Sequence, residues 1–85
     1  MYKIVFKKEA AKSLSKIPSK AAQSIRRKLE AIAANPYGNH PDAKKLQGRE
    51  GYRLRIGDWR VIYEIQNDRL VILVLKIAPR GEVYR

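Results

Sequence analysis

The stretch GYRLRIGDWRVIYEI, residues 51–65, decides how this 85-residue chain folds. On both sides of Gly57-Asp58, large apolar residues alternate with mostly polar ones, which is the pattern of a strand with one covered and one exposed face. Gly-Asp is a dipeptide typical of the two-residue turns that close β-hairpins. We therefore expect a β-hairpin here. Its exposed face gathers three arginines: Arg53, Arg55 and Arg60.

The two-residue turn also sets the register of the hairpin. Ile56 is expected to face Trp59, and Arg55 is expected to face Arg60. Alternation then places the large apolar residues on one face, where helices can cover them. Two arginines directly opposite each other destabilise a sheet by up to ~1 kcal/mol relative to a neutral pair. Their presence indicates a role other than folding; the alternative is a merely solvated polar face.

The residues before this hairpin predict one strand and two helices. Apolar and polar residues alternate over residues 2–6, as in a half-exposed strand. Over residues 8–17 apolar residues recur at helical spacing, and Pro18 ends this helix because the residue before a proline avoids helical dihedral angles. A second helix with a single apolar stripe follows and ends at Asn35-Pro36. We expect two antiparallel helices that lead into a sheet.

The remaining segments are predicted to be a loop and a buried strand. Residues 36–51 are dense in Pro, Gly, Asn and Asp, which is typical of a loop. Residues 70–77 are apolar at nearly every position, as in a strand inside a sheet. A two-residue turn before this strand would place Lys76 on the apolar face, and a three-residue turn would place it on the arginine face. We expect the second, because it keeps an ammonium group out of the core.

The chain is strongly basic, with 19 Lys and Arg residues against 8 Asp and Glu residues and a net charge of +11. The first 34 residues carry nine of the basic side chains. Hydrophobic residues make up 45% of the chain, which fits a globular domain and not a disordered basic tail. We expect one domain spanning residues 1–85. Its expected partner is a polyanion, with nucleic acid favoured over a membrane surface.

Missing residue types and motifs narrow the function further. Without cysteine the chain has no disulfide, zinc ribbon or thiol nucleophile, which fits the cytoplasm. Its longest apolar run is far shorter than the ~20 residues of a membrane span, and its N-terminus has no signal-peptide core. One histidine, His40, and scattered carboxylates show no metal-ligand spacing, and neither a phosphate-binding glycine loop nor a Ser-His-Asp set is present. We expect a soluble, cytoplasmic protein.

The predicted arginine face fits phosphate chemistry. Guanidinium groups bind phosphate in a planar, bidentate manner and stay charged at every relevant pH. A cluster of them suits a reaction whose transition state gains negative charge at phosphorus. If the substrate is RNA, its own 2′-hydroxyl can be the nucleophile. Tyr84, which follows the last strand, can stack on a base; alternatively it belongs to a frayed terminus.

A second basic surface is predicted on the helices. Six of their side chains are candidate contacts to RNA or the ribosome: Lys12, Lys16, Lys20, Arg26, Arg27 and Lys28. The alternative is that they form the solvated side of two helices. Among the remaining singled-out residues, Trp59 and Tyr63 are expected in the core, and His40 is expected to be solvated.

The order of these elements and three motifs resemble the RelE/ParE superfamily of bacterial type II toxins. The most specific motif is Tyr-x-x-x-x-Gly-Asp-x-Arg-x-x-Tyr at residues 52–63. Lys-Leu-Gln-Gly at residues 45–48 and Arg-Gly-Glu-Val-Tyr at residues 80–84 are similar to the same family. The resemblance implies an α+β, two-layer fold of order β-α-α-β-β-β. In this fold a helical hairpin packs on one face of a mostly antiparallel four-stranded sheet.

Within this superfamily, RelE-like members cut mRNA on the ribosome, whereas ParE-like members poison DNA gyrase and lack the nuclease residues. Carried over by position, the catalytic residues of the RelE branch fall on Arg53, Arg55, Arg60, Arg80 and Tyr84. All five positions are filled, which favours the RelE branch. Some members have a proton-abstracting lysine where this chain has arginine, and arginine, with a pKa above ~12, is a poor base. The identity of the base therefore stays open.

The resemblance implies the toxin of a type II toxin–antitoxin system that acts as a metal-independent, ribosome-dependent endoribonuclease (mRNA interferase) without a cofactor. Attack of the 2′-hydroxyl on the adjacent phosphate would leave a 2′,3′-cyclic phosphate and a 5′-hydroxyl, inhibit translation and arrest growth. The expected partners are an acidic antitoxin, the ribosome and mRNA. Promoter DNA is reached only through the antitoxin complex, and no membrane is involved. The alternative is a ParE-like inhibitor of DNA gyrase without nuclease activity.

Overall fold

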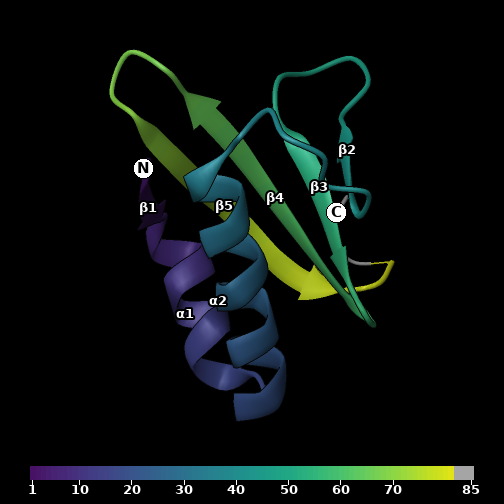
Figure 1. Ribbon diagram of the computed structural model, residues 1–85. Coiled ribbons are helices and arrows are strands. Elements are labelled where there is room, and N and C mark those ends of the chain that lie inside the picture. Colours follow the sequence, from purple (N-terminus) through teal and green to yellow (C-terminus); the bar gives the residue numbers. More distant parts are fainter. Residues whose placement is uncertain (82–85) are drawn as a thin grey trace.

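The computed structural model describes residues 1–81 as two helices packed on one five-stranded sheet (Figure 1). The elements, in chain order, are β1 (Lys3–Phe6), α1 (Lys8–Lys16), α2 (Ser19–Ala34), β2 (Ala43–Lys45), β3 (Tyr52–Ile56), β4 (Trp59–Gln66) and β5 (Val71–Pro79). The sheet order is β1-β5-β4-β3-β2, with β1 parallel to β5 and the other neighbours antiparallel. Both helices cover the same face of the sheet (Figure 1). The predicted two-layer fold with its helical hairpin is confirmed.

The sheet has five strands, so the prediction of four strands is wrong in this detail. The additional strand, β2, lies within residues 36–51, where the sequence pattern predicts a loop. Two of its three residues are exposed lysines, so it lacks the apolar alternation of a strand. Backbone hydrogen bonds flank its pairing with β3: Arg55 N–H donates to Asp42 C=O (2.9 Å), and Leu46 N–H donates to Gly51 C=O (2.9 Å). Pairing through the backbone leaves no signal in the side-chain pattern.

Pro18 separates the two helices, as predicted. The backbone is extended at both Ile17 and Pro18, and α2 begins at the next residue. The side chains that each helix buries lie three to four residues apart, apart from one adjacent pair, and form one stripe. They are Ala10 and Leu14 of α1 and Ile25, Leu29, Ile32 and Ala33 of α2.

The core lies between this helical layer and the covered face of the sheet. Its largest fully buried side chains are Tyr63, Ile25, Leu29, Ile32, Leu54, Ile72, Val61 and Val74. Each fully buried apolar side chain of this size contributes about 1.5–3 kcal/mol. The expected burial of Tyr63 is confirmed. Trp59 is only partly buried, because it lies at the end of β4 opposite Pro79 and packs on the rim of the core.

The β3–β4 hairpin has the predicted register, with Ile56 opposite Trp59 and Arg55 opposite Arg60. Gly57 has a φ of +56°, a left-handed value that glycine adopts without strain. A positive φ at the first turn position matches the twist of the two strands that the turn connects. This turn therefore places the arginines of both strands on the face that the helices leave uncovered.

β5 lies inside the sheet between β1 and β4, as its apolar sequence predicts. Lys76 faces Ile62, which itself faces Arg53, so Lys76 lies on the arginine side of the sheet as expected. The reason differs from the predicted three-residue turn. Residues 67–70 form a four-residue connection, and a register shift between Ile62 and Tyr63 compensates for its length.

Candidate nucleic-acid interface

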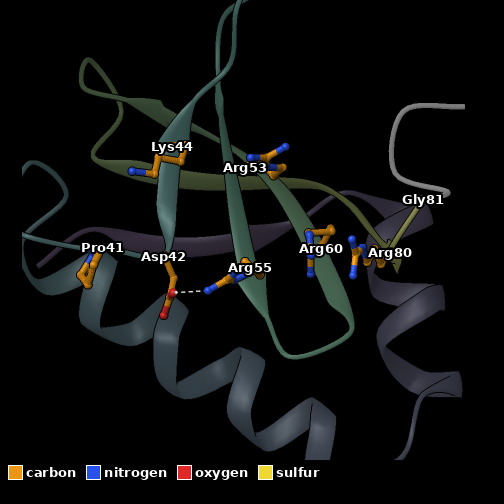
Figure 2. A pocket seen from close by; sticks show the side chains of 8 residues that line it. All are labelled: Pro41, Asp42, Lys44, Arg53, Arg55, Arg60, Arg80 and Gly81. Carbon is orange, nitrogen blue, oxygen red and sulfur yellow. Dashed lines mark ion pairs between the residues drawn. The ribbon is translucent and has the colours of Figure 1, made fainter.

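Four of the five predicted catalytic side chains line one pocket of about 450 Å³ on the uncovered face of the sheet (Figure 2). Its described lining consists of Pro41, Asp42, Lys44, Arg53, Arg55, Arg60, Arg80 and Gly81. Five of these side chains are cationic and one is a carboxylate. A concave surface with this imbalance attracts anions. The fifth predicted residue, Tyr84, lies outside the described residues. We call this site the arginine pocket.

Strand pairing places the cations of the arginine pocket side by side. Arg55 faces Arg60 across β3 and β4, and Lys44 faces Arg53 across β2 and β3. The Cβ atoms of directly opposed residues lie ~4.5–5.5 Å apart, and like charges at that separation destabilise a sheet. Folding alone does not explain two such pairs. The sequence pattern misses Lys44, because it predicts a loop where β2 pairs with β3.

The β3–β4 turn holds two arginines at one end of the pocket. The guanidinium Nη1 of Arg60 donates to the carbonyl oxygens of Gly57 (2.9 Å) and Trp59 (3.0 Å). The backbone N–H of Arg80 donates to the carbonyl oxygen of Asp58 at 2.8 Å, which fixes the end of β5 to the same turn. Figure 2 shows the two arginine side chains next to each other. The fold thus positions the charge of Arg60 and fixes the backbone of Arg80 beside it.

Asp42 supplies the carboxylate of the described lining and connects α2 to the pocket. It forms a short ion pair with Lys28 of α2, and its Oδ1 lies 3.7 Å from Nη2 of Arg55 (Figure 2). The hydrogen bond and the charge of Lys28, together with the charge of Arg55, lower the pKa of Asp42 below its ordinary value of 3.8. An ionised carboxylate therefore lies beside the exposed guanidinium of Arg55. Sequence reasoning misses Asp42, because it is brought to Arg55 by β2.

The six helical side chains that are predicted to contact RNA or the ribosome differ in their surroundings. Lys28 reaches the rim of the arginine pocket through Asp42. The guanidinium of Arg26 lies over the ring of Phe6, 5.9 Å from its centroid. The other four are exposed on the helical layer, across the sheet from the pocket: Lys12, Lys16, Lys20 and Arg27. The helical surface is therefore separate from the arginine pocket, and its role stays a prediction.

Two further observations concern residues 1–81. Among these residues, no group of three or more His, Cys, Asp or Glu side chains comes together that could hold a metal ion. In the same part of the chain, no helix is long and apolar enough to cross a membrane.

Comparison with known proteins identifies the family. The family described as "ParE toxin of type II toxin-antitoxin system, parDE" matches residues 4–84. A protein named as toxin RelE1 from Methanocaldococcus jannaschii is 30% identical, over 99% of this chain and 96% of its own length. The archaeal RelE–RelB complex from Pyrococcus horikoshii matches with a TM-score of 0.81 and 30% identity, over 96% of this chain and 98% of that chain. The isolated Escherichia coli RelE toxin shares the fold, with a TM-score of 0.82 and 24% identity over 99% of this chain and 92% of that chain. The chain therefore belongs to the RelE/ParE superfamily of type II toxin–antitoxin toxins.

Proposed function

We propose that this toxin is an endoribonuclease that cleaves mRNA on the ribosome in the cytoplasm and thereby inhibits translation. The observation that carries the proposal is the arginine pocket, where Arg53, Arg55, Arg60 and Arg80 come together. The RelE branch has its nuclease residues at these positions, and this chain fills each of them. Relatives named RelE support the same branch.

The proposed reaction transfers a phosphoryl group within the RNA. The 2′-oxygen attacks the adjacent phosphorus, and the bond from phosphorus to the 5′-oxygen of the next nucleotide breaks. The 2′-hydroxyl loses a proton and the leaving 5′-oxygen gains one, so the products are a 2′,3′-cyclic phosphate and a 5′-hydroxyl. Negative charge grows on the non-bridging oxygens in the transition state. Cations that the fold holds in place stabilise that charge more than they stabilise the substrate.

The contacts of three of the four arginines suggest their roles. Arg60, whose guanidinium donates to the β3–β4 turn, and Arg80, whose backbone donates to the same turn, are proposed to bind the scissile phosphate. Arg55, whose guanidinium lies 3.7 Å from Asp42, is proposed to neutralise charge from the other side. None of them accepts the proton of the 2′-hydroxyl, because a guanidinium stays protonated. Tyr84 is proposed to stack near the scissile step and to orient the phosphate or a transferred proton.

We also propose an acidic antitoxin as the partner of this toxin. Solved structures similar to the chain include RelE–RelB complexes from Pyrococcus horikoshii and, at 26% identity, from Methanococcus jannaschii. A net charge of +11 and a pocket with five cations favour a partner of opposite charge. Charge complementarity of this kind speeds association and makes binding depend strongly on salt.

A substrate that lacks the attacking group tests the proposed reaction. Ribosomes are programmed with an mRNA that carries a single 2′-deoxynucleotide at the mapped cleavage site, and with its all-ribose control. The control should be cut and should end in a 2′,3′-cyclic phosphate, whereas the deoxy substrate should stay intact at that site. An uncut control, or cleavage at the deoxy position, would contradict the proposal.

One observation favours a second function, inhibition of DNA gyrase: the family that matches the chain is described as ParE toxin. In that case the chain would inhibit DNA gyrase without cutting RNA. A supercoiling assay with purified gyrase separates the two functions. The proposed nuclease should leave supercoiling unchanged at concentrations that cleave mRNA on the ribosome, whereas a gyrase inhibitor should show the reverse.

A further inference from the structure

A second pocket, of about 620 Å³, lies at the end of the sheet where β3 begins, between the β2–β3 loop and the β4–β5 turn (Figure 1). It shares no lining residue with the arginine pocket. Its lining includes three carboxylates, Glu50, Glu64 and Asp68, and two cations, Lys45 and Arg69. The chain has eight acidic residues and a net charge of +11, so three carboxylates at one pocket are a local excess. We call this site the acidic notch.

The acidic notch forms because β4 is longer than its neighbour β3. Tyr52 and Tyr63 are the last residue pair of the two strands, whereas β4 continues to Gln66 and still pairs with β5 there. Gly51, directly before β3, has a φ of +115°, and its carbonyl oxygen accepts a hydrogen bond from the N–H of Leu46. The chain therefore turns from β4 towards β2 at Gly51 and leaves the end of β4 uncovered on this side.

The uncovered part of β4 has an open backbone edge. The N–H of Arg55 donates to Asp42, next to β2, so Tyr52, three residues earlier on β3, points its backbone groups to β4. Its partner Tyr63 points back to β3, and Ile65, two residues further along β4, has the same orientation. The β3–β4 ladder ends at Tyr63, and within residues 1–81 no turn or loop backbone group hydrogen-bonds to Ile65 in its place. The N–H and C=O of Ile65 therefore face the acidic notch.

An exposed aromatic ring lines the same notch. Tyr37, in the segment between α2 and β2, is 63% exposed. Its hydroxyl accepts a hydrogen bond from Nδ2 of Asn67 (2.7 Å), and Oδ1 of Asn67 accepts one from the hydroxyl of Tyr2 (2.7 Å). Asn67 thus fixes Tyr37 to the β4–β5 turn. A ring beside carboxylates suits a cation, because the face of an aromatic ring attracts positive charge.

Each of these features indicates one property of an occupant. An open N–H and C=O on a strand can pair with an extended peptide backbone. The carboxylates and the ring can bind a lysine or arginine side chain. RNA and an acidic antitoxin segment are disfavoured, because the notch has more carboxylates than cations. We infer that the acidic notch is a docking site for an extended, basic segment of another protein, which pairs with Ile65 and places a lysine or arginine against Tyr37 and the carboxylates.

Amide NMR of the ¹⁵N-labelled wild type tests this inference with a peptide, acetyl-Thr-Val-Lys-Val-Thr-amide, and with a matched peptide that has glutamate in place of lysine. The lysine peptide should shift the Ile65 amide signal and slow its hydrogen–deuterium exchange, because the amide gains a strand partner. The same peptide should leave the amide signals of Arg55 and Arg60 in place. The glutamate peptide should not shift the Ile65 signal.

A pair of charge variants tests the carboxylates. Glu50→Gln/Glu64→Gln removes two carboxylates from the acidic notch, and the control Glu9→Gln/Glu30→Gln removes two exposed carboxylates from α1 and α2. The first variant should bind the lysine peptide about fivefold more weakly than the wild type. The control should keep the wild-type affinity, although its net charge changes by the same amount.

Three outcomes would overturn this docking site. One is an Ile65 signal that the two peptides move equally or that neither peptide moves. Another is wild-type affinity of Glu50→Gln/Glu64→Gln for the lysine peptide. The third is an Ile65 shift caused by protein concentration alone or by a 2′-O-methyl RNA octamer, because the occupant would then be a second copy of the chain or RNA. The inference does not depend on the nuclease reaction, since the two pockets share no lining residue.

Discussion

At the scale of single residues, Arg60 is held in place by its own turn and repelled by its neighbour. Its guanidinium donates to two carbonyl oxygens of the β3–β4 turn, and Arg55 lies directly opposite it. The hydrogen bonds fix the position of the charge, while the opposed arginine offsets what it contributes to folding. A substitution of Arg60 should therefore change the cleavage rate with little change in the free energy of unfolding, unlike a substitution in the core.

Arg60→Ala should lower the rate of ribosome-dependent cleavage about 10²–10³-fold, as expected when one preorganised charge is lost from a transition state. Its free energy of unfolding should change by less than about 0.5 kcal/mol. Arg80→Ala should behave in the same way. Single-turnover cleavage and urea denaturation measure the two quantities. A variant that unfolds, or one that cuts at the wild-type rate, would remove Arg60 from the site.

Tyr84 is the predicted catalytic residue that lies outside the described residues, so its role rests on the sequence alone. Stacking on a base is worth ~1–3 kcal/mol, so Tyr84→Ala should lose at least tenfold in ribosome-dependent cleavage. Tyr84→Phe keeps the ring and loses only the hydroxyl, so its rate should fall between the two. Antitoxin binding should weaken less than cleavage in both variants. A wild-type cleavage rate for Tyr84→Ala would exclude Tyr84 from the catalytic site and leave only the four arginines in it.

Tyr63 gives the protein a pH dependence on the alkaline side. Its ring stacks on Tyr52 with 5.3 Å between centroids, and burial together with Tyr52 raises the pKa of Tyr63 from 10.0 to about 12. The folded state favours the neutral phenol, so this contribution to stability is complete below pH 10 and is lost as the pH rises through about 12. The urea midpoint of the wild type should therefore fall more steeply over this range than that of Tyr63→Phe. Parallel curves would contradict this assignment.

At the scale of elements, the β3–β4 hairpin could be predicted pair by pair because a two-residue turn permits one register. β2 could not be predicted, since it pairs through backbone hydrogen bonds and its residues show no apolar alternation, and Asp42 and Lys44 escape prediction with it. The side of the sheet on which Lys76 lies could be predicted, because an ammonium group avoids the core. The length of the connection before β5 could not, because it depends on the register shift between β4 and β5, which is a tertiary feature. The polarity of a residue thus predicts which face of the sheet it occupies, whereas the length of a loop depends on tertiary packing.

Asp42 links β2, β3 and α2, and its removal should affect both stability and cleavage. Because its pKa is lowered in the folded protein, its contribution to stability is present above pH 3.8 and is lost as the pH falls through the lower folded value. Asp42→Asn should therefore have a lower urea midpoint than the wild type at neutral pH, and this difference should shrink as the pH falls below 3.8. It should also slow cleavage, because Arg55 loses the carboxylate that lies beside it. The exposed Asp68→Asn serves as the control, and identical curves for the two variants would contradict the role of Asp42.

At the scale of the whole molecule, the two-layer fold explains why the arginines are accessible. Both helices pack on one face of the sheet, and the other face carries the arginine pocket (Figures 1 and 2). The stability of the chain thus comes from one side and the proposed chemistry from the other. An acidic antitoxin segment that covers the arginine pocket would block substrate entry without disturbing the core.

Primer extension on cellular transcripts after brief induction tests the central claim most directly. The wild type should produce new 5′ ends within translated regions, and these ends should disappear when translation of the same transcript is prevented by removing its start codon. The Arg60→Ala/Arg80→Ala variant, expressed to the same level, should produce none. Growth arrest with intact transcripts, or cuts that persist without translation, would contradict a ribosome-dependent nuclease.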